Sequence, residues 1–245
     1  MLLLNGDCIE QMKIIPAASV DMIFTDLPYG TTARNIWDKK IPLEPLWEQV
    51  LRVIKPNGVI ALWSQMPFSV ELIMSQPKLF RYEWIIEKTT ATGFLNANKM
   101  PMKAHESILI FYKTLPTYNP QMTHNHPRKI ITAEHKRNSK KSTDYDEHKL
   151  TSYDSTDRYP RDVLKFKWDK QKSRLHPTQK PVEACEYFIK TYTNTGDLIL
   201  DCCMGSGTIG VAAIKNKRKF IGIEIDESYY AIAKERIAEY GRFSI

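Results

Sequence analysis

Long apolar runs are missing from this sequence, so we expect neither a membrane-spanning helix nor a membrane partner. The apolar start Met1–Leu4 turns polar at Asn5, which does not match a secretory signal peptide, and a cytoplasmic location is expected. Cysteine is scarce, with four residues and no C-x-x-C pair, so reduced and mostly buried thiols are expected. The histidines lie mainly in one polar segment without the spacing of metal ligands, which argues against a metal site.

The charge of the chain is unevenly distributed. The 245 residues suffice for one large α/β domain that carries an insertion, and the formal net charge of +7 permits a polyanionic partner. Residues 115–173 hold 13 Lys and Arg against 8 Asp and Glu, so most of the excess lies there. This segment has low hydrophobicity and interleaved aromatic residues. It suits either a nucleic-acid surface or a charged insertion that has no partner.

The segment Thr25–Gly30 reads Thr-Asp-Leu-Pro-Tyr-Gly and follows the apolar β-formers of residues 19–24, which predict a buried strand. A strand followed by such a tight loop places Asp26 and Tyr29 at the carboxyl edge of a sheet, where open α/β sheets bind ligands. Asp26 would accept a hydrogen from an amino group while Tyr29 stacks on the ring that carries it. An ordinary turn with a capping Asp is the alternative interpretation.

Alternating helix and strand patterns predict an α/β fold with a mostly parallel, twisted sheet and helices on both faces. After a first strand and a helical turn, residues 41–54 and 68–74 predict helices around a strand at 59–63. Residues 81–87 and 106–112 predict two strands joined by the loop 88–105, so an antiparallel hairpin is expected at one edge of the sheet. The later predicted elements are helices at 181–192, 209–215 and 227–240, with strands at 197–201 and 219–224.

A second ligand loop is predicted between the strand 197–201 and the helix that follows it. The Gly-rich turn Cys202–Thr208 lets a ligand approach the backbone, and Glu224 ends the next strand, where an acid suits ribose hydroxyls. This pattern predicts a nucleoside site. Gly205–Gly210 also satisfies G-x-G-x-x-G, so an NAD-dependent dehydrogenase is a rival interpretation, although it leaves the Asp26 loop unexplained.

Separate segments along the chain together resemble the DNA amino-methyltransferases. Thr25–Gly30 resembles their Asp-Pro-Pro-Tyr motif, with Leu27 in place of the first Pro, and Asp201–Thr208 fits their Asp-x-x-x-Gly-Ser-Gly-Thr pattern except at Cys202-Cys203. His176–Pro181 is similar to a segment that precedes the cofactor strand. The order of these motifs resembles the permuted beta class. The resemblance implies the Rossmann-like fold of methyltransferases that use S-adenosylmethionine.

The resemblance also implies roles for individual residues. The catalytic loop comprises Asp26, Leu27, Pro28 and Tyr29, with the Leu27 carbonyl as a second acceptor for the target amine. Asp7 matches an acidic position that contacts the cofactor's adenine, although a helix N-cap explains it equally well. The implied S-adenosylmethionine contacts are Asp7, Thr178, Gln179, Lys180, Asp201, Gly205, Ser206, Gly207, Thr208 and Glu224. In the hairpin loop, Phe94 and Asn96 are candidates for contacts to an extruded base, with a plain surface loop as the alternative.

The implied reaction is methyl transfer from S-adenosylmethionine to the N6 amine of adenine in flipped-out DNA. Adenine is preferred to cytosine N4 because the motif begins with Asp rather than Ser. The sequence also has no Pro-Cys dipeptide of the kind that ring-carbon cytosine methyltransferases use. A non-catalytic DNA-binding module is the remaining alternative. Double-stranded DNA is the expected partner, and a homodimer and a cognate restriction endonuclease are further candidates. The predicted parts are a catalytic half at 1–114, a basic target-recognition insertion at 115–173 and a cofactor-binding half at 174–245.

Overall fold

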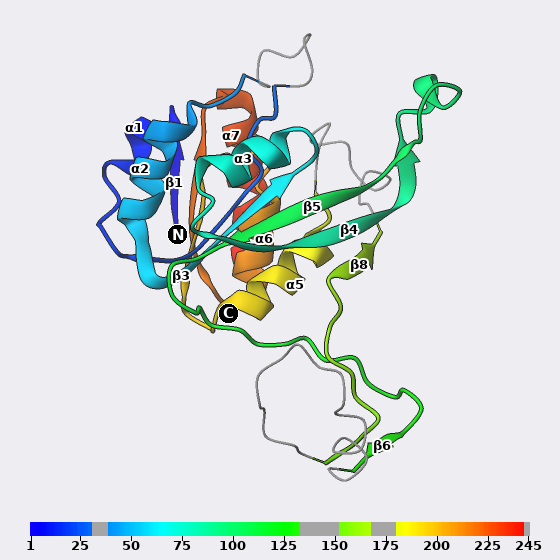
Figure 1. Ribbon diagram of the computed structural model, residues 1–245. Coiled ribbons are helices and arrows are strands. Elements are labelled where there is room, and N and C mark those ends of the chain that lie inside the picture. The colour runs from blue at the N-terminus through cyan, green and yellow to red at the C-terminus, as the bar shows by residue number, and fades with distance from the viewer. Residues whose placement is uncertain (31–38, 133–151, 168–179, 243–245) are drawn as a thin grey trace. The chain divides into compact units, whose positions relative to one another are not determined.

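The structure is a computed structural model that describes residues 1–30, 39–132, 152–167 and 180–242 (Figure 1). The chain divides into two compact units. The larger unit comprises Met1–Asn119 and Asp162–Ile245, and the smaller unit comprises Pro120–Arg161. The predicted loop segment at Thr178 and Gln179 lies outside the described residues.

The larger unit is built on an eight-stranded sheet with the order β1-β10-β9-β2-β3-β5-β4-β8. All neighbouring strands run parallel except β5, which is antiparallel to both β3 and β4. The strands in that order are Leu2–Asn5, Lys219–Glu224, Leu198–Asp201, Val20–Thr25, Ile54–Ser64, Lys103–Phe111, Phe80–Thr92 and Val163–Phe166. The predicted mostly parallel sheet with an antiparallel hairpin is therefore confirmed.

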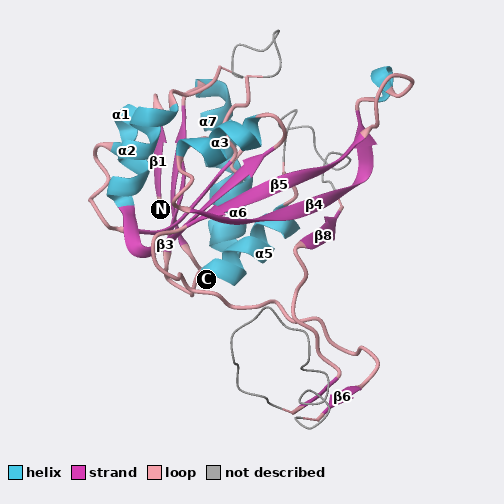
Figure 2. Ribbon diagram, viewed as in Figure 1, coloured by secondary structure: helices cyan, strands magenta, loops and turns pink. Residues whose placement is uncertain are grey.

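Helices cover both faces of this sheet, as the continuous apolar runs of the central strands require (Figure 2). In β2, Met22 and Phe24 pack on one face and Val20 and Ile23 on the other. The helices of the first face are α5 (Val182–Tyr192), α6 (Thr208–Lys215) and α7 (Glu227–Arg242). Those of the second face are α1 (Cys8–Met12), α2 (Leu43–Val53) and α3 (Phe68–Ser75). Because β2, β9 and β10 run parallel to one another, their carboxyl ends lie at the same edge of the sheet.

The β4–β5 hairpin is longer than the sequence pattern predicts. The strands continue through much of the predicted loop 88–105, and Thr92 pairs with Lys103 before the short 3₁₀ helix η1 (Phe94–Asn96). Figure 1 shows the end of this hairpin projecting beyond the helices. The hairpin is not the outermost element, because β8 pairs beyond β4, with Val163 opposite Ile85. A short strand from the predicted insertion thus becomes the edge of the main sheet.

The smaller unit contains a two-stranded antiparallel ribbon of β6 (Lys129–Ile131) and β7 (Tyr153–Ser155). The guanidinium of Arg128 donates to both oxygens of Asp154 at 2.8 and 2.7 Å, which joins the two strand ends on the surface. The unit lies inside the predicted insertion 115–173 but is shorter than it at both ends. The chain therefore returns to the main sheet at Asp162, before β8 begins.

Candidate active site

Asp26 stands directly after β2, at the carboxyl edge of the sheet. The hydroxyl of Tyr29 donates to Asp26 Oδ1 at 2.8 Å, and Lys180 Nζ lies 3.0 Å from Asp26 Oδ2. Leu27 is buried at 3% exposure and anchors the loop in the core, while Gly30 ends it with a φ of 65°. The loop is thus held by its own hydrogen bond, by an ion pair and by apolar packing, and it presents a carboxylate that remains 23% exposed.

Asp26 belongs to a group of four ionisable side chains, which we call the charged cluster: Asp26, Lys88, Glu106 and Lys180. Lys180 Nζ lies 2.7 Å from Glu106 Oε2, and Lys88 Nζ lies 2.9 Å from Glu106 Oε1. The exposed fractions of the Lys88, Glu106 and Lys180 side chains are 7%, 13% and 8%. The cluster therefore ties the Asp26 loop to β4, to β5 and to the segment that enters α5.

The two members Lys88 and Glu106 were not predicted from the sequence. A signal is nevertheless present, because each lies where a buried strand segment meets polar sequence: Lys88 follows Trp84–Ile86 and Glu106 precedes Ser107–Phe111. Charged residues at such positions need a partner when they are largely buried. The pairing partner lies on a different strand, so pattern reasoning along one strand does not find it.

The ionisation of the charged cluster follows from its burial and its alternating charges. Burial raises the pKa of the Asp26 carboxyl; the Lys180 ammonium opposes this rise and the Glu106 carboxylate adds to it. Burial also disfavours the charged form of Glu106, but Lys180 and Lys88 together hold its pKa below the usual value. Burial lowers the pKa of Lys180, and the charges of Asp26, Tyr29 and Glu106 outweigh this and hold it well above its ordinary value. Lys180 is therefore a permanent cation beside Asp26.

Aromatic rings form the wall beside this carboxylate. The ring of Tyr29 packs on Phe68 with centroids 5.3 Å apart, and Lys180 Nζ lies 5.8 Å from the Tyr29 centroid and 4.9 Å from that of Trp63. These cation–π contacts add to the electrostatic environment of Lys180. The predicted stacking of Tyr29 on a base stays a prediction, and the structure assigns its hydroxyl to Asp26.

The predicted nucleoside site is built at the neighbouring strand ends. Gly205 and Gly207 adopt φ angles of 49° and 77°, and the backbone N–H of Gly205 donates to Glu224 Oε2 at 2.8 Å. The N–H of Asp226 donates to Glu224 Oε1 at 2.9 Å, so the carboxylate at the end of β10 is fixed in position. The carboxylate suits the sugar hydroxyls of a nucleoside cofactor, and the glycine turn lets the nucleoside approach the protein backbone closely.

Two predicted cofactor residues face α7 in the structure. The guanidinium of Arg236 donates to the Ser206 carbonyl at 3.1 Å, to Ser206 Oγ at 3.2 Å and to Thr208 Oγ1 at 3.0 Å. Both side chains are buried, at 4% and 6% exposure. Ser206 and Thr208 therefore secure the turn to the last helix, and a direct contact to the cofactor stays a prediction.

Asp201 connects the two predicted loops. Its Oδ1 accepts from the Thr25 hydroxyl at 2.8 Å and from the Cys203 N–H at 3.2 Å, and the residue is 2% exposed. Thr25 precedes Asp26, so this bond joins the end of β9 to the catalytic loop. Burial raises the pKa of Asp201 to about 7. Cys202, whose thiol lies 3.5 Å from Thr25 Oγ1, packs in the core beside this bond.

The raised pKa of Asp201 gives a testable dependence of stability on pH. Its stabilising contribution is complete below the usual carboxyl pKa near 4 and is lost as pH rises through about 7. Asparagine at 201 keeps the Oδ1 that accepts both hydrogen bonds and carries no charge. We expect the free energy of unfolding of Asp201→Asn to rise by about 2 kcal/mol relative to that of the native chain as the pH increases from 5 to 8. Urea unfolding at both pH values measures this, and a difference that does not change with pH would contradict it.

The remaining predicted residues divide into those that the structure places and those that it does not. Asp7 Oδ1 accepts from the N–H groups of Ile9 and Glu10 at 2.9 and 3.1 Å, so Asp7 caps α1. It follows β1, which pairs with β10 beside Glu224, and a contact to the cofactor's adenine stays a prediction. Thr178 and Gln179 lie outside the described residues. Lys180, the next residue, joins the charged cluster.

Two further expectations from the sequence concern a metal site and a membrane-spanning helix. Across residues 1–30, 39–132, 152–167 and 180–242, no group of three His, Cys, Asp or Glu side chains is placed to hold a metal ion. No helix within those ranges has the length and apolar character needed to cross a bilayer.

Comparison with known proteins agrees with this geometry. A family model described as DNA methylase matches residues 20–235. The DNA adenine methyltransferase YhdJ of Escherichia coli (strain K12) is 30% identical and is aligned over 99% of this chain and 84% of its own length. The type II methyltransferase M.HpaI of Haemophilus parainfluenzae is 27% identical, over 98% of this chain and 76% of its own.

Solved structures share the fold. The M1.HpyAVI–SAM complex superposes with a TM-score of 0.64 at 22% identity and covers 96% of this chain and 98% of that one. The cytosine-N4-specific PvuII DNA methyltransferase superposes with a TM-score of 0.67 at 16% identity, over 98% and 90%. The family match spans most of the chain and includes both loops of the site. The chain therefore belongs to the DNA methylase family.

Proposed function

We propose that this protein transfers a methyl group from S-adenosylmethionine to the N6 amine of adenine in duplex DNA. The observation that carries the proposal is the placement of Asp26 at the carboxyl edge of the sheet, partly exposed and held by Tyr29 and Lys180. Asp201 joins this loop, through Thr25, to the strand that leads into the glycine turn of the nucleoside site. One edge of the sheet thus holds an acceptor for an amine and a cradle for a nucleoside.

The chemistry of an aromatic amine explains why a fixed carboxylate is needed. The lone pair of such an amine is delocalised into the ring, so the nitrogen is a weak nucleophile. Asp26 and the carbonyl of Leu27 would accept its two hydrogens and turn the lone pair toward the methyl donor. The carboxylate would also stabilise the positive charge that grows on the nitrogen, and this positioning and charge complementarity lower the barrier.

Lys180 has a specific part in this arrangement. The ammonium beside Asp26 opposes the rise in pKa that burial causes, so it favours the ionised carboxylate that the reaction needs. An ammonium has three donors, and Asp26 and Glu106 occupy two of them in the structure. In the proposed arrangement the third donor would bind the carboxylate of the cofactor.

The cofactor supplies a methyl group on a sulfonium when it is bound. In the proposed arrangement Glu224 would hold the ribose and Asp7 would approach the adenine. The backbone of the Gly205–Gly207 turn would lie against the nucleoside. These assignments rest on the oriented carboxylate of Glu224 and on the positive φ angles of the two glycines.

The substrate assignment rests on the motif and on the basic segment. Asp at position 26 favours adenine, and one 30% identical relative is named an adenine methyltransferase. The fold does not decide the base, because a cytosine-N4-specific enzyme has the same one. The smaller unit, Pro120–Arg161, is the proposed reader of the DNA sequence, since it lies within the basic segment. A homodimer and a cognate restriction endonuclease are further proposed partners.

Incubating the protein with methyl-labelled S-adenosylmethionine and unmethylated genomic DNA tests the proposal directly. After digestion to nucleosides, we expect the label in N6-methyl-2′-deoxyadenosine and nowhere else. Label in N4-methylcytosine would keep the reaction and overturn the choice of base. Cofactor binding without label in any DNA would favour the non-catalytic binding module.

A further inference from the structure

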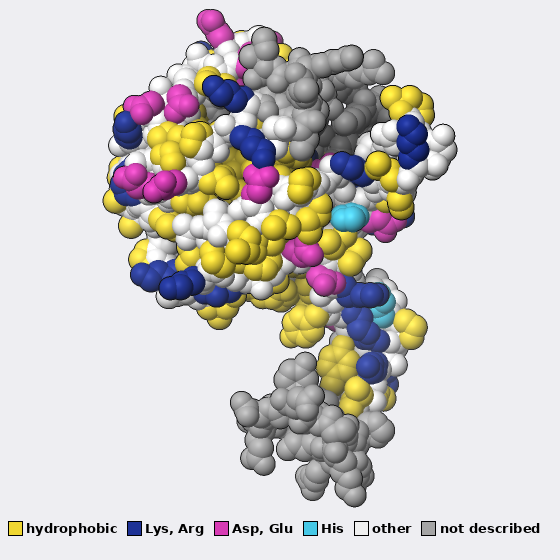
Figure 3. Space-filling view, turned by 45° about the horizontal axis from the view of Figure 1, so that its top comes forward, with side chains coloured by type: hydrophobic (Ala, Val, Ile, Leu, Met, Phe, Trp, Pro, Cys, Tyr) yellow, Lys and Arg dark blue, Asp and Glu magenta, His cyan; other side chains and the backbone are white. Residues whose placement is uncertain are grey.

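The end of the β4–β5 hairpin carries an unusual concentration of exposed apolar side chains. Phe94 and Leu95 are 73% and 80% exposed, and Met100 and Met102 are 55% and 40% exposed. The space-filling view shows hydrophobic and Lys side chains next to one another where this hairpin ends (Figure 3). Two adjacent large apolar residues at the tip of a projecting hairpin indicate a contact surface rather than part of a core.

The tip has a defined backbone. Gly93 adopts a φ of 91°, and the N–H groups of Asn96 and Ala97 donate to the carbonyls of Gly93 and Phe94 at 3.0 and 3.1 Å. The N–H of Met100 donates to the Asn96 carbonyl at 3.0 Å, which closes the turn. These backbone hydrogen bonds hold the tip, while the side chains of Phe94 and Leu95 are exposed.

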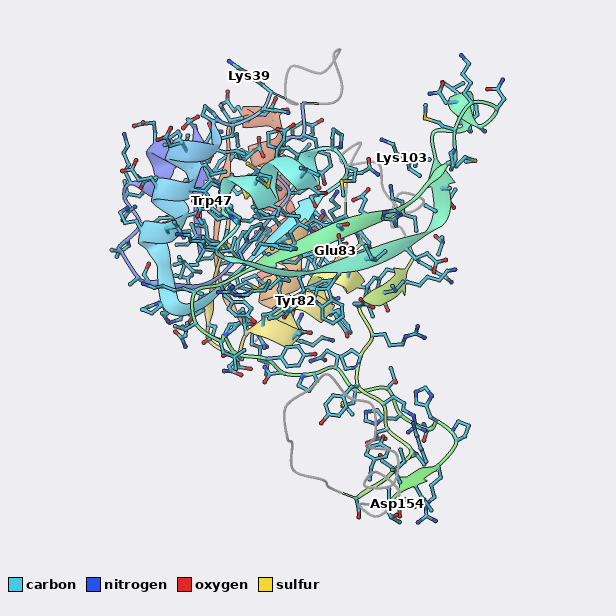
Figure 4. The ribbon with its side chains drawn as sticks, in the orientation of Figure 1. Lys39, Trp47, Tyr82, Glu83, Lys103 and Asp154 are labelled. Carbon is cyan, nitrogen blue, oxygen red and sulfur yellow. The ribbon has the colours of Figure 1, made fainter. Side chains whose placement is uncertain are left out.

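The charge of the hairpin favours a polyanionic partner. From Lys88 to His105 the sequence has three lysines and no acidic residue. Lys99 and Lys103 are exposed beside the apolar tip, and Lys103 points from β5 where the hairpin leaves the sheet (Figure 4). An apolar tip beside the two exposed lysines complements duplex DNA, which combines a polyanionic backbone with an apolar base stack.

The hairpin leaves the sheet on the side of the candidate active site. β4 runs in the same direction as β2, because β5 is antiparallel to both β3 and β4 and β3 is parallel to β2. Lys88 of β4 connects through Glu106 and Lys180 to Asp26. Phe94 follows Lys88 by six residues, which span about 20 Å of extended chain at most. A duplex held at Asp26 would therefore meet the tip within the same binding event.

We propose that Phe94 and Leu95 act as an apolar wedge that enters the base stack of the duplex beside the target nucleotide. This inference rests on the proposed methyl transfer to a base in duplex DNA. Extruding a base breaks its pairing and stacking, at a cost of a few kcal/mol. Apolar side chains that fill the resulting gap recover part of the lost stacking and keep the base out of the helix. The wedge role differs from lining the pocket, because a wedge touches the DNA that remains stacked.

The test compares the native chain with Phe94→Ala/Leu95→Ala on two duplexes that contain the mapped methylation site. In the first the target base is paired, and in the second an abasic site lies opposite it, which lowers the cost of extrusion. We expect single-turnover methylation by the variant to fall about 30-fold on the paired duplex and to stay within about threefold of the native rate on the other. Leu51→Ala, which shortens a side chain of 42% exposure on α2, is the matched control and should change neither rate.

Fluorescence and oligomeric state, together with the two rates, separate the outcomes. Fluorescence of 2-aminopurine at the target position reports extrusion directly, and the variant should show a weaker increase on the paired duplex. An equal loss on both duplexes would assign the tip to the pocket and overturn the wedge, and so would no loss on either. A dimer of the native chain that becomes monomeric in the variant would assign the tip to self-association instead. If the native chain itself methylates neither duplex, the proposed function fails, which is a different result.

Discussion

Asp26→Ala is expected to lower single-turnover methyl transfer to DNA by about 10³-fold or more, since removing one preorganised group that faces developing charge typically has effects of this size. The variant removes the carboxylate of the charged cluster that directly follows β2 and remains 23% exposed. Binding of S-adenosylmethionine, measured by calorimetry, should stay within about threefold of the native value, because the Glu224 carboxylate and the glycine turn are untouched.

The matched control for this variant is Asp21→Ala in the same strand. Asp21 lies on β2 before the apolar run and pairs with Lys55 at 2.6 Å, and its other oxygen accepts from the Leu198 N–H at 2.9 Å. This control loses some stability but should retain the native rate of methyl transfer. Near-normal turnover of Asp26→Ala would sink the assignment of Asp26 as the acceptor for the amine.

The second large effect is expected from Glu106→Gln, because Glu106 is the shared partner of two lysines. The substitution would leave Lys88 and Lys180, both largely buried, without the carboxylate that they share. Breaking a buried ion pair from one side commonly costs about 3 kcal/mol or more. We expect a loss of this order in the free energy of unfolding at neutral pH, measured in urea.

Glu106→Gln should also move the pH dependence of catalysis. The Glu106 carboxylate raises the pKa of Asp26, so its removal lowers that pKa, and the acid limb of the kcat/KM profile should shift to lower pH. The pKa of Glu106 itself is held below its usual value, so the stability it contributes is present above that usual value and is lost as pH falls through the lower one. The two unfolding curves should therefore converge in acid.

Glu87→Gln is the matched control, one residue before Lys88 on the same strand. Glu87 pairs with Lys165 at 2.6 Å on the surface, where the two side chains are 45% and 59% exposed. Such a pair contributes about 0–1 kcal/mol, so this variant should leave both the unfolding curve and the acid limb nearly unchanged. If Glu106→Gln behaved like Glu87→Gln, the charged cluster would have no part in setting the ionisation of the Asp26 carboxyl.

The sequence was a reliable guide where a pattern is local. The apolar period of residues 41–54 and the strand pattern at 59–63 predict α2 and the second half of β3, and the structure places these elements there. The structure also extends β3 back to Ile54, through the Pro-Asn-Gly sequence that was predicted to separate the two elements. The loops that follow β2 and β9 were found in the same way, because a loop after a buried strand carries its own turn residues. The function was predicted because these motifs lie in a particular order along the chain.

Pattern reasoning failed where a partner is distant in the sequence. The low hydrophobicity of residues 115–173 gives no sequence signal for β8. This strand forms because β4 has unpaired backbone groups on the side away from β5, and β8 pairs with them. Lys88 and Glu106 were overlooked because each becomes meaningful only beside Lys180. Ser206 and Thr208 match the cofactor motif, yet their hydroxyls are bonded to Arg236 on the last helix.

Short-range periodicity and turn chemistry specify strands, helices and the loops between them, so the α/β class and the loops after β2 and β9 follow from the sequence, and the ligand roles of Asp26 and Glu224 stay predictions. Which charges meet depends instead on how the strands assemble. The parallel order of β9, β2 and β3 brings Asp201 to Thr25, and the β4–β5 hairpin brings Lys88 and Glu106 to Lys180. These contacts join residues far apart along the chain, and their electrostatic strength depends on burial, which exists only after the sheet has assembled.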